Sequence, residues 1–144
     1  DGIKIELKLV GYGATLELCK KYVLDNNLQD NVAFIPEIKH EQVNAFYNKI
    51  DLFVLPSYYE ALGCVYMEAW ATETPFIAIK NQGIEELLSQ SERACLLAEK
   101  QSPESLKEKI LDEYHKKRAF PFDYKYDIKN TIPAFLKNPF FNNA

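Results

Sequence analysis

Two glutamates, Glu60 and Glu68, stand eight positions apart and are the strongest sign of chemistry in this sequence. They flank a change in the pattern of apolar residues. The run 52–55, Leu-Phe-Val-Leu, is short and apolar, which is typical of a buried strand, and Pro56 ends it. From Leu62 the apolar residues recur at helical spacing. We therefore expect Glu60 in the loop after a strand and Glu68 on the following helix.

This placement indicates a site for a polyhydroxylated ligand. Ionised carboxylates accept hydrogen bonds from adjacent hydroxyls, and open α/β sheets bind ligands beyond the carboxyl ends of their strands. Gly63 permits close approach of the backbone, and the amides of Gly63, Cys64 and Val65 at the helix start can receive phosphate or sugar oxygens. Taken alone, the pair has a commoner explanation, which is two solvated acids favoured by the helix dipole.

The neighbouring residues carry a family resemblance. Residues 56–75 are similar to the E-x7-E region of the retaining GT-B glycosyltransferases of family 4, group 1. Four other segments match that family in the same order: the Gly11-Tyr-Gly13 turn, the strand and loop 31–37, the helix-strand pair 46–57, and Gly83-Ile-Glu-Glu. Several matches in order are far more specific than one short motif.

The resemblance implies a role for each matched position. Glu60 would be the catalytic residue that holds the hydroxyls of the donor sugar, and Glu68 would hold those of the ribose. The backbone of 63–65 would face the diphosphate. The remaining donor-binding positions implied by the family are Gly11, Gly13, Ile35, Pro36, Ile38, Gly83 and Ile84. The loop 34–38 would receive the base, and the family needs neither a metal nor another cofactor.

Four positions depart from the family pattern. Pro36, Glu73, Gln82 and Ala94 stand where the family usually carries glycine. The family's domain also begins one strand and one helix earlier, with cations that clamp the donor pyrophosphate. We therefore expect 1–118 to be a donor-binding domain without its first strand and helix. If the strand order is 3-2-1-4-5-6, the absent strand belongs between 3–10 and 52–55.

The fold class follows from alternating patterns along the chain. Apolar runs alternate with helical periodicity, which predicts a doubly wound parallel α/β sheet covered on both faces. The resemblance identifies it as Rossmann-like, the C-terminal half of a GT-B architecture. The expected strands are 3–10, 32–35, 52–55, 75–79 and 94–97, and the expected helices are 14–27, 41–49, 62–72, 84–88 and 102–117. The aromatic tail, 119–144, is expected to pack on this domain or its partner domain.

Composition narrows the classes of function. The 144 residues are 47% hydrophobic and 26% charged, and a net charge of −4 argues against a nucleic-acid surface. No apolar run approaches the about 20 residues that span a bilayer. The three cysteines lack metal-ligand spacing, and Cys64 has no neighbouring histidine that would make it a nucleophile. A cytoplasmic location, or one at the inner face of a membrane, fits these features.

The resulting hypothesis is the donor-binding half of a transferase that moves a sugar from a nucleoside-diphosphate sugar, with UDP or GDP, to a glycan or lipid-linked acceptor. Its expected partner is an N-terminal acceptor-binding domain, and the chain by itself is expected to be inactive. Peripheral membrane contact and self-association stay open, as does a setting in polysaccharide biosynthesis. Two alternatives also stay open: a non-catalytic nucleotide-sugar-binding or scaffold module with a degenerate site, and a GT-B-like sugar-nucleotide epimerase.

Overall fold

The computed structural model describes residues 3–136, and its chain divides into two compact units, 1–43 and 44–144. This division separates two compact units and does not test the expected domain boundary at residue 118, which stays a prediction. Residues 137–144 of the expected tail lie outside the described residues.

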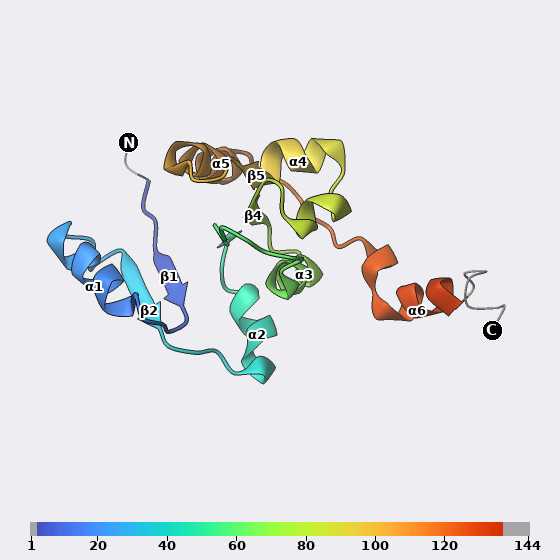
Figure 1. The fold of residues 1–144 in the computed structure, drawn as a ribbon, viewed down its shortest axis with the longest axis horizontal. Coiled ribbons are helices and arrows are strands. Elements are labelled where there is room, and N and C mark those ends of the chain that lie inside the picture. Colours follow the sequence, from blue (N-terminus) through green and yellow to red (C-terminus); the bar gives the residue numbers. More distant parts are fainter. Residues whose placement is uncertain (1–2, 137–144) are drawn as a thin grey trace. The chain divides into compact units, whose positions relative to one another are not determined.

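The first unit is a strand-helix-strand arrangement (Figure 1). Strand β1 (Leu7–Val10) pairs in parallel with β2 (Val32–Ile35), and α1 (Leu16–Asp25) connects them. The register places Leu7 opposite Val32 and Val10 opposite Ile35. Two parallel strands joined through a helix form the expected β-α-β unit. Strand β1 is shorter than the predicted strand 3–10, which begins four residues earlier.

The second unit contains a parallel sheet with the strand order β3-β4-β5. Its elements, with α2 leading into it, are α2 (His40–Tyr47), β3 (Phe53–Val54), α3 (Cys64–Ala71), β4 (Phe76–Ile79), η1 (Gly83–Leu87), α4 (Gln90–Leu96), β5 (Leu97–Ala98), α5 (Pro103–Lys116), η2 (Tyr124–Tyr126) and α6 (Ile128–Leu136). All pairings in this sheet are parallel, as predicted. The order of strands across the two units is still untested.

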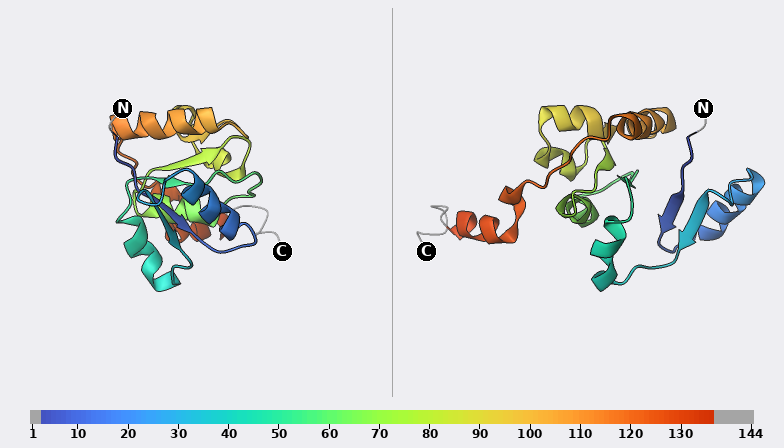
Figure 2. Two further views of the ribbon diagram at one scale, coloured as in Figure 1. Left: turned by 90° about the vertical axis from the view of Figure 1, so that its left-hand side faces the viewer. Right: turned by 180° about the vertical axis from the view of Figure 1, so that it is seen from behind.

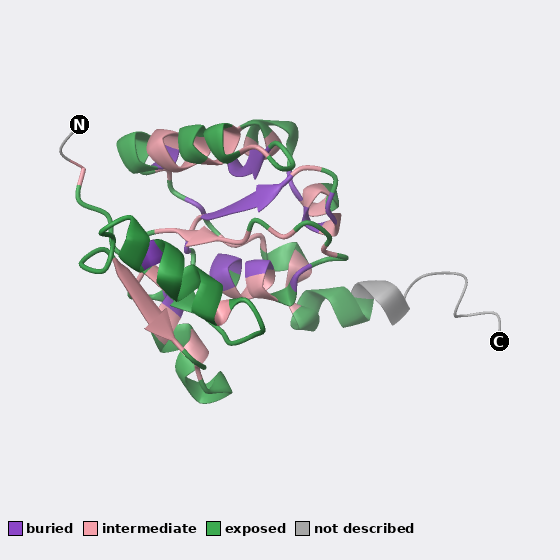
Figure 3. Cartoon of the chain, turned by 60° about the vertical axis from the view of Figure 1, so that its left-hand side comes forward, coloured by how far each residue is buried: buried purple, intermediate pink, exposed green. Residues whose placement is uncertain are grey.

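Strand β4 is buried along its whole length (Figure 3). Its side chains belong to two separate core clusters. Phe76 and Ala78 belong to a core cluster with Tyr66 and Trp70 of α3. Ile77 and Ile79 point to the opposite face, where Leu106 and Ile110 of α5 pack against them. Figures 1 and 2 show α5 on one side of β4 and α3 on the other. The sheet is therefore covered on both faces, as a doubly wound sheet requires.

The prediction of a strand at 94–97 is wrong for three of its four residues. Ala94, Cys95 and Leu96 form the end of α4, and the strand β5 begins only at Leu97. The cause is a capping box: the Ser89 hydroxyl accepts from the Glu92 amide, and the Glu92 carboxylate accepts from the Ser89 amide. This pair satisfies free amides at the helix start and begins a helix that apolar periodicity alone does not show.

The segment after α5 packs into the core of the second unit. Phe120 stacks on Trp70 with ring centroids 5.4 Å apart, and the Trp70 indole donates to the Pro121 carbonyl at 2.9 Å. The Tyr126 hydroxyl donates to the Leu87 carbonyl at 3.1 Å. The sequence pattern did not predict η2 or α6. Pro133 lies inside α6, which is one reason that helical periodicity was hard to recognise there.

The helices of residues 3–136 include none with the length and apolar character that a bilayer crossing demands. Within the same residues, no three acidic, histidine or cysteine side chains gather closely enough to hold a metal ion.

Candidate functional site

The candidate site lies where two neighbouring parallel strands end. Strand β3 is followed by the loop that carries Glu60, and β4 is followed by the loop that carries Gln82 and Gly83. Phe53 pairs with Phe76 in the parallel register, so both strands point the same way. Their carboxyl ends therefore bring the two loops to the same edge of the sheet, which is where open α/β sheets bind ligands.

The two loops touch through their backbones at Gly83. The Gly83 amide donates to the Glu60 carbonyl at 3.4 Å. A Cβ placed on Gly83 would lie 1.5 Å from the carbonyl oxygen of Ala61 and 2.7 Å from its carbonyl carbon. Only glycine permits this approach. The glycine matched to the family is thus required by contact with the loop that holds Glu60.

Gln82 fastens the same loop through both ends of its side-chain amide. Its Oε1 accepts from the Glu60 amide, and its Nε2 donates to the Tyr58 carbonyl at 3.2 Å. Only 6% of Gln82 is exposed. A buried amide with both groups satisfied holds its partners in fixed positions, because leaving either group unpaired is costly.

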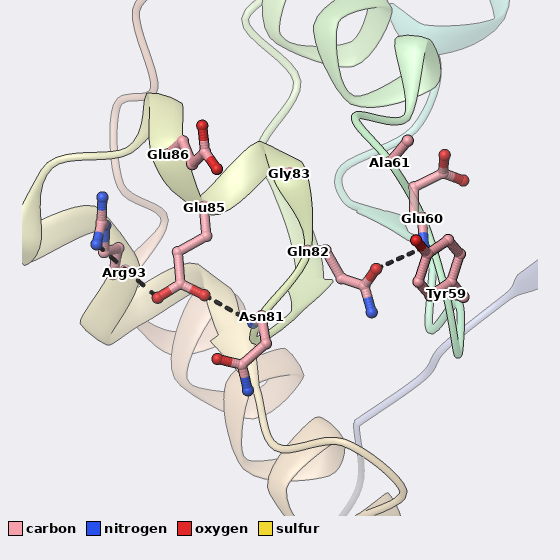
Figure 4. A pocket seen from close by; sticks show the side chains of 9 residues that line it. All are labelled: Tyr59, Glu60, Ala61, Asn81, Gln82, Gly83, Glu85, Glu86 and Arg93. Atoms are coloured by element: carbon pink, nitrogen blue, oxygen red, sulfur yellow. Dashed lines mark hydrogen bonds and ion pairs between the residues drawn. The ribbon is translucent and has the colours of Figure 1, made fainter.

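These loops, η1 and α4 line an open pocket of about 470 Å³ (Figure 4). Its lining carries three carboxylates and one cation, and the lining residues are Tyr59, Glu60, Ala61, Asn81, Gln82, Gly83, Glu85, Glu86 and Arg93. Carboxylates in such numbers suit a ligand that presents hydroxyl hydrogens. Glu68 is not among the lining residues.

Arg93 and Glu85 are held together on one side of the pocket, as Figure 4 shows. Arg93 Nη1 lies 3.9 Å from Glu85 Oε1, and Arg93 Nε donates to the Leu88 carbonyl at 2.9 Å. The other oxygen of Glu85 accepts from the Asn81 amide at 2.7 Å. Glu85 and Arg93 thus have partners within the protein, and Glu60 and Glu86 are the other two lining acids.

The helix α3 begins with amides that have no acceptor in the helix. Gly63 takes a left-handed conformation with φ 73°, and no side chain caps the helix start. A Cβ there would lie 2.6 Å from the Tyr66 ring and 3.0 Å from Cγ of Glu60. The amides of Cys64 and Val65 lie in the first turn, where a helix provides no acceptor and its dipole favours anions.

Tyr66 connects this helix start to the end of β3. Its ring is fully buried, and its hydroxyl donates to the Leu55 carbonyl at 2.8 Å. Burial raises the pKa of Tyr66, and the nearby Glu60 carboxylate raises it further. The hydroxyl therefore stays protonated, and the hydrogen bond fixes α3 against the strand that carries the Glu60 loop.

Glu68 projects from α3 beside Tyr47 of α2. It is half-buried and lies on the helix where the sequence predicted it. The Tyr47 hydroxyl contacts Glu68 Oε2 at 3.5 Å and donates to the Val65 carbonyl at 3.1 Å. Burial raises the pKa of Tyr47, and the charge of Glu68 adds to this effect. Glu68 thus has a neutral hydroxyl as its neighbour.

Several predicted donor-binding positions belong to the first unit. Gly11 has a φ of 130°, and its amide donates to the Ile35 carbonyl at 2.9 Å, so this glycine is required by its conformation. Pro36 and Gly13 are exposed, and Ile38 is half-buried. No geometry relates these residues to the second unit, so their part in donor binding stays a prediction.

Several residues at or near the site have structural roles that the sequence did not predict. Ile84 is fully buried in the core and has no exposed surface, so its part in donor binding stays a prediction. Gln82 was noticed only as a departure from glycine, yet it braces the Glu60 loop. Tyr47 carried no sequence signal beyond its aromatic character, and Tyr66 stood out only as part of the apolar helical pattern that begins at Leu62. Their hydrogen-bond partners are distant in the chain, so these contacts were not predicted.

A parallel α/β sheet with an acidic pocket at the carboxyl ends of two strands defines a Rossmann-like ligand-binding domain. The chain belongs to the family of glycosyl transferases group 1, whose model matches residues 1–126. The resemblance stated from the sequence is therefore confirmed, and with it the GT-B type of fold.

Similar proteins support the same assignment. An uncharacterized glycosyltransferase of Methanocaldococcus jannaschii is 34% identical over 110 residues, which are 76% of this chain and 31% of that protein. A D-inositol 3-phosphate glycosyltransferase of Corynebacterium efficiens is 30% identical over 87 residues, 60% of this chain and 20% of that one. The solved sucrose-phosphate synthase of Thermosynechococcus elongatus matches with a TM-score of 0.74 and 25% identity, over 96% of this chain and 39% of the synthase. The chain therefore spans less than half the length of each protein.

Proposed function

We propose that this chain is the donor-binding half of a retaining glycosyltransferase. It would bind a nucleoside-diphosphate sugar and present the sugar to an acceptor held by another domain. The shared family and the partial coverage of longer glycosyltransferases support this proposal. The observation that carries it is the backbone contact between Gly83 and Ala61, which joins the loops after β3 and β4 around one acidic pocket.

Each group at the site has a chemical task in this proposal. The Glu60 carboxylate accepts hydrogen bonds from hydroxyls of the donor sugar, and that of Glu68 accepts them from the ribose. The free amides of Cys64 and Val65 at the start of α3 face the diphosphate, where the helix dipole favours negative charge. Positioned dipoles of this kind stabilise the charge that develops on the leaving diphosphate. No metal is needed for these tasks.

A binding experiment tests the proposal directly. UDP, GDP, UDP-glucose, UDP-N-acetylglucosamine and GDP-mannose are titrated into the protein by calorimetry. At least one nucleoside diphosphate and its sugar conjugate should bind, and Glu60→Ala should weaken the conjugate selectively. If no nucleotide binds at millimolar concentration, or if both Glu60→Ala and Glu68→Gln leave binding unchanged, the proposal is wrong.

A product assay tests the stereochemical part. With an acceptor domain present, NMR of the new glycosidic bond should show the anomeric configuration of the donor. An inverted product would contradict the retaining assignment while leaving donor binding intact.

A further inference from the structure

We infer that Gln82 is a positioning residue for the donor sugar, acting through the backbone of the Glu60 loop. This inference rests on the proposed function, because it assigns Gln82 a role in presenting Glu60 to the sugar. This role does not require Gln82 to contact the ligand. What it fixes is the segment 58–60, from which the Glu60 carboxylate reaches the pocket.

The hydrogen bonds have a definite direction. Glu60 N–H donates to Gln82 Oε1, while Gln82 Nε2 donates to the Tyr58 carbonyl at 3.2 Å. The segment therefore needs one acceptor and one donor from the same side chain. Among side chains of this length, a neutral amide supplies both. The Gly83 amide adds a third hydrogen bond to this segment, which it donates to the Glu60 carbonyl at 3.4 Å.

Burial makes the arrangement rigid. Gln82 is 6% exposed, while its neighbour Tyr59 is 85% exposed and Tyr58 is 63% exposed. The tip of the loop is thus exposed to solvent. The buried side-chain amide of Gln82 makes two of the hydrogen bonds that hold this loop to the rest of the unit. Without those hydrogen bonds the Glu60 side chain would sample more positions, and the sugar would have to order it on binding.

The substitution Gln82→Glu separates positioning from simple packing. The glutamate keeps the shape of the side chain. When ionised it can accept from the Glu60 amide, but it faces the Tyr58 carbonyl with a second acceptor. When protonated it supplies one donor and one acceptor, as glutamine does. The variant should therefore recover wild-type behaviour as the pH falls.

The wild type and the Gln82→Glu variant have the same other charged groups around position 82. They are Glu60 on the same loop system, Glu85 and Glu86 on η1, and Arg93 on α4, which all line the pocket. Lys100 also lies 4.0 Å from the centre of the Tyr58 ring. Gln82→Ala, which adds no carboxylate, is measured at the same pH values, so that the titration of these groups can be separated from that of the new side chain.

The first measurement needs no ligand. Amide hydrogen exchange by NMR should show the Glu60 amide protected in the wild type and exchanging about tenfold faster in Gln82→Ala, since one hydrogen bond is lost. The Lys80 amide, which donates to the Ala98 carbonyl at 3.0 Å, serves as an internal control and should be unchanged. Gln90→Ala, at an exposed position of α4, is the matched control variant.

The second measurement is calorimetry with the sugar nucleotide and nucleoside diphosphate that bind the wild type. Gln82→Ala should lower affinity for the conjugate by about tenfold and leave the nucleoside diphosphate within about twofold. Gln82→Glu should match the alanine variant near pH 8 and approach the wild type near pH 5. A loss shared equally by both ligands, an unchanged Glu60 amide, or a pH-independent ratio of the Gln82→Glu and Gln82→Ala affinities would each overturn the inference.

Failure of the proposed function would look different. In that case no nucleotide binds the wild type, while the exchange experiment still reports whether Gln82 braces the Glu60 amide. Binding of nucleotides without the predicted split would refute the positioning role alone.

Discussion

The hydroxyl of Tyr47 lies 3.5 Å from Oε2 of Glu68, with Val65 accepting from the same hydroxyl at 3.1 Å. One phenol therefore contacts the candidate ribose-binding acid and the backbone at the start of α3. Burial raises the pKa of Tyr47, so its hydroxyl remains a neutral donor across the physiological range. Glu68 thus has a neutral donor as its neighbour, and its carboxylate has lone pairs left to accept from a ligand.

We expect Glu68→Gln to weaken nucleoside-diphosphate binding by about three- to tenfold, because an amide accepts less strongly than a carboxylate. The amide keeps the size of the side chain and can still contact Tyr47. Calorimetry with UDP and GDP measures the change. Glu108→Gln, at an exposed position of α5, is the control and should bind like the wild type. Equal affinities for Glu68→Gln and the control would remove Glu68 from the site.

Glu60 should matter more for the sugar than for the nucleotide. We expect Glu60→Ala to lower sugar transfer, and binding of the sugar conjugate, while UDP or GDP binding changes by less than about 1 kcal/mol. The reason is that Glu60 lines the pocket and Glu68 does not. The two glutamates would be assigned the wrong way round if Glu60→Ala reduced nucleotide affinity as strongly as it reduced affinity for the conjugate.

Local patterns predicted much of the second unit. The run 52–55 predicted β3, and the helical stripe from Leu62 predicted α3, with Tyr66 and Trp70 buried as that stripe requires. The order of family-like segments predicted the fold type. These features depend on residues close in sequence, or on motifs that the family keeps together.

Contacts between distant residues could not be predicted. Gln82 was recognisable as a departure from glycine, but its bonds to Tyr58 and Glu60 depend on two loops meeting in space. The helix α4 was missed because its apolar end resembles a strand, although the Ser89 and Glu92 capping box marks its start.

Gly83→Ala should destabilise the second unit by about 3 kcal/mol or more, because the new methyl group would overlap the Ala61 carbonyl and the backbone would have to move. Urea unfolding followed by fluorescence of the single tryptophan, Trp70, measures the change in this unit. Gly13→Ala is a matched control, since no atom lies within 4 Å of its added Cβ. A stability equal to the wild type for Gly83→Ala would show that the two loops are farther apart than described.

Phe120→Ala should lower the free energy of unfolding by about 3 kcal/mol, since it removes a buried ring that stacks on Trp70. Tyr124→Ala removes a nearby ring that is 67% exposed, and its effect should stay within about 0.5 kcal/mol. The same urea experiment compares them. Similar losses for the two variants, or none for Phe120→Ala, would contradict packing of the 119–126 segment against α3.

Glu73→Gly should stabilise the protein, although it removes a side chain. Glu73 has a φ of 57° in the turn after α3, and its amide donates to the Trp70 carbonyl at 2.8 Å. A left-handed conformation costs a residue with a Cβ about 1 to 2 kcal/mol, and glycine avoids that cost but loses more backbone entropy on folding. We expect a net gain of about 0.5 to 1 kcal/mol in urea unfolding. Glu73→Ala keeps the Cβ and should show no gain, so an equal gain for both variants would place the effect in the exposed carboxylate and not in the backbone.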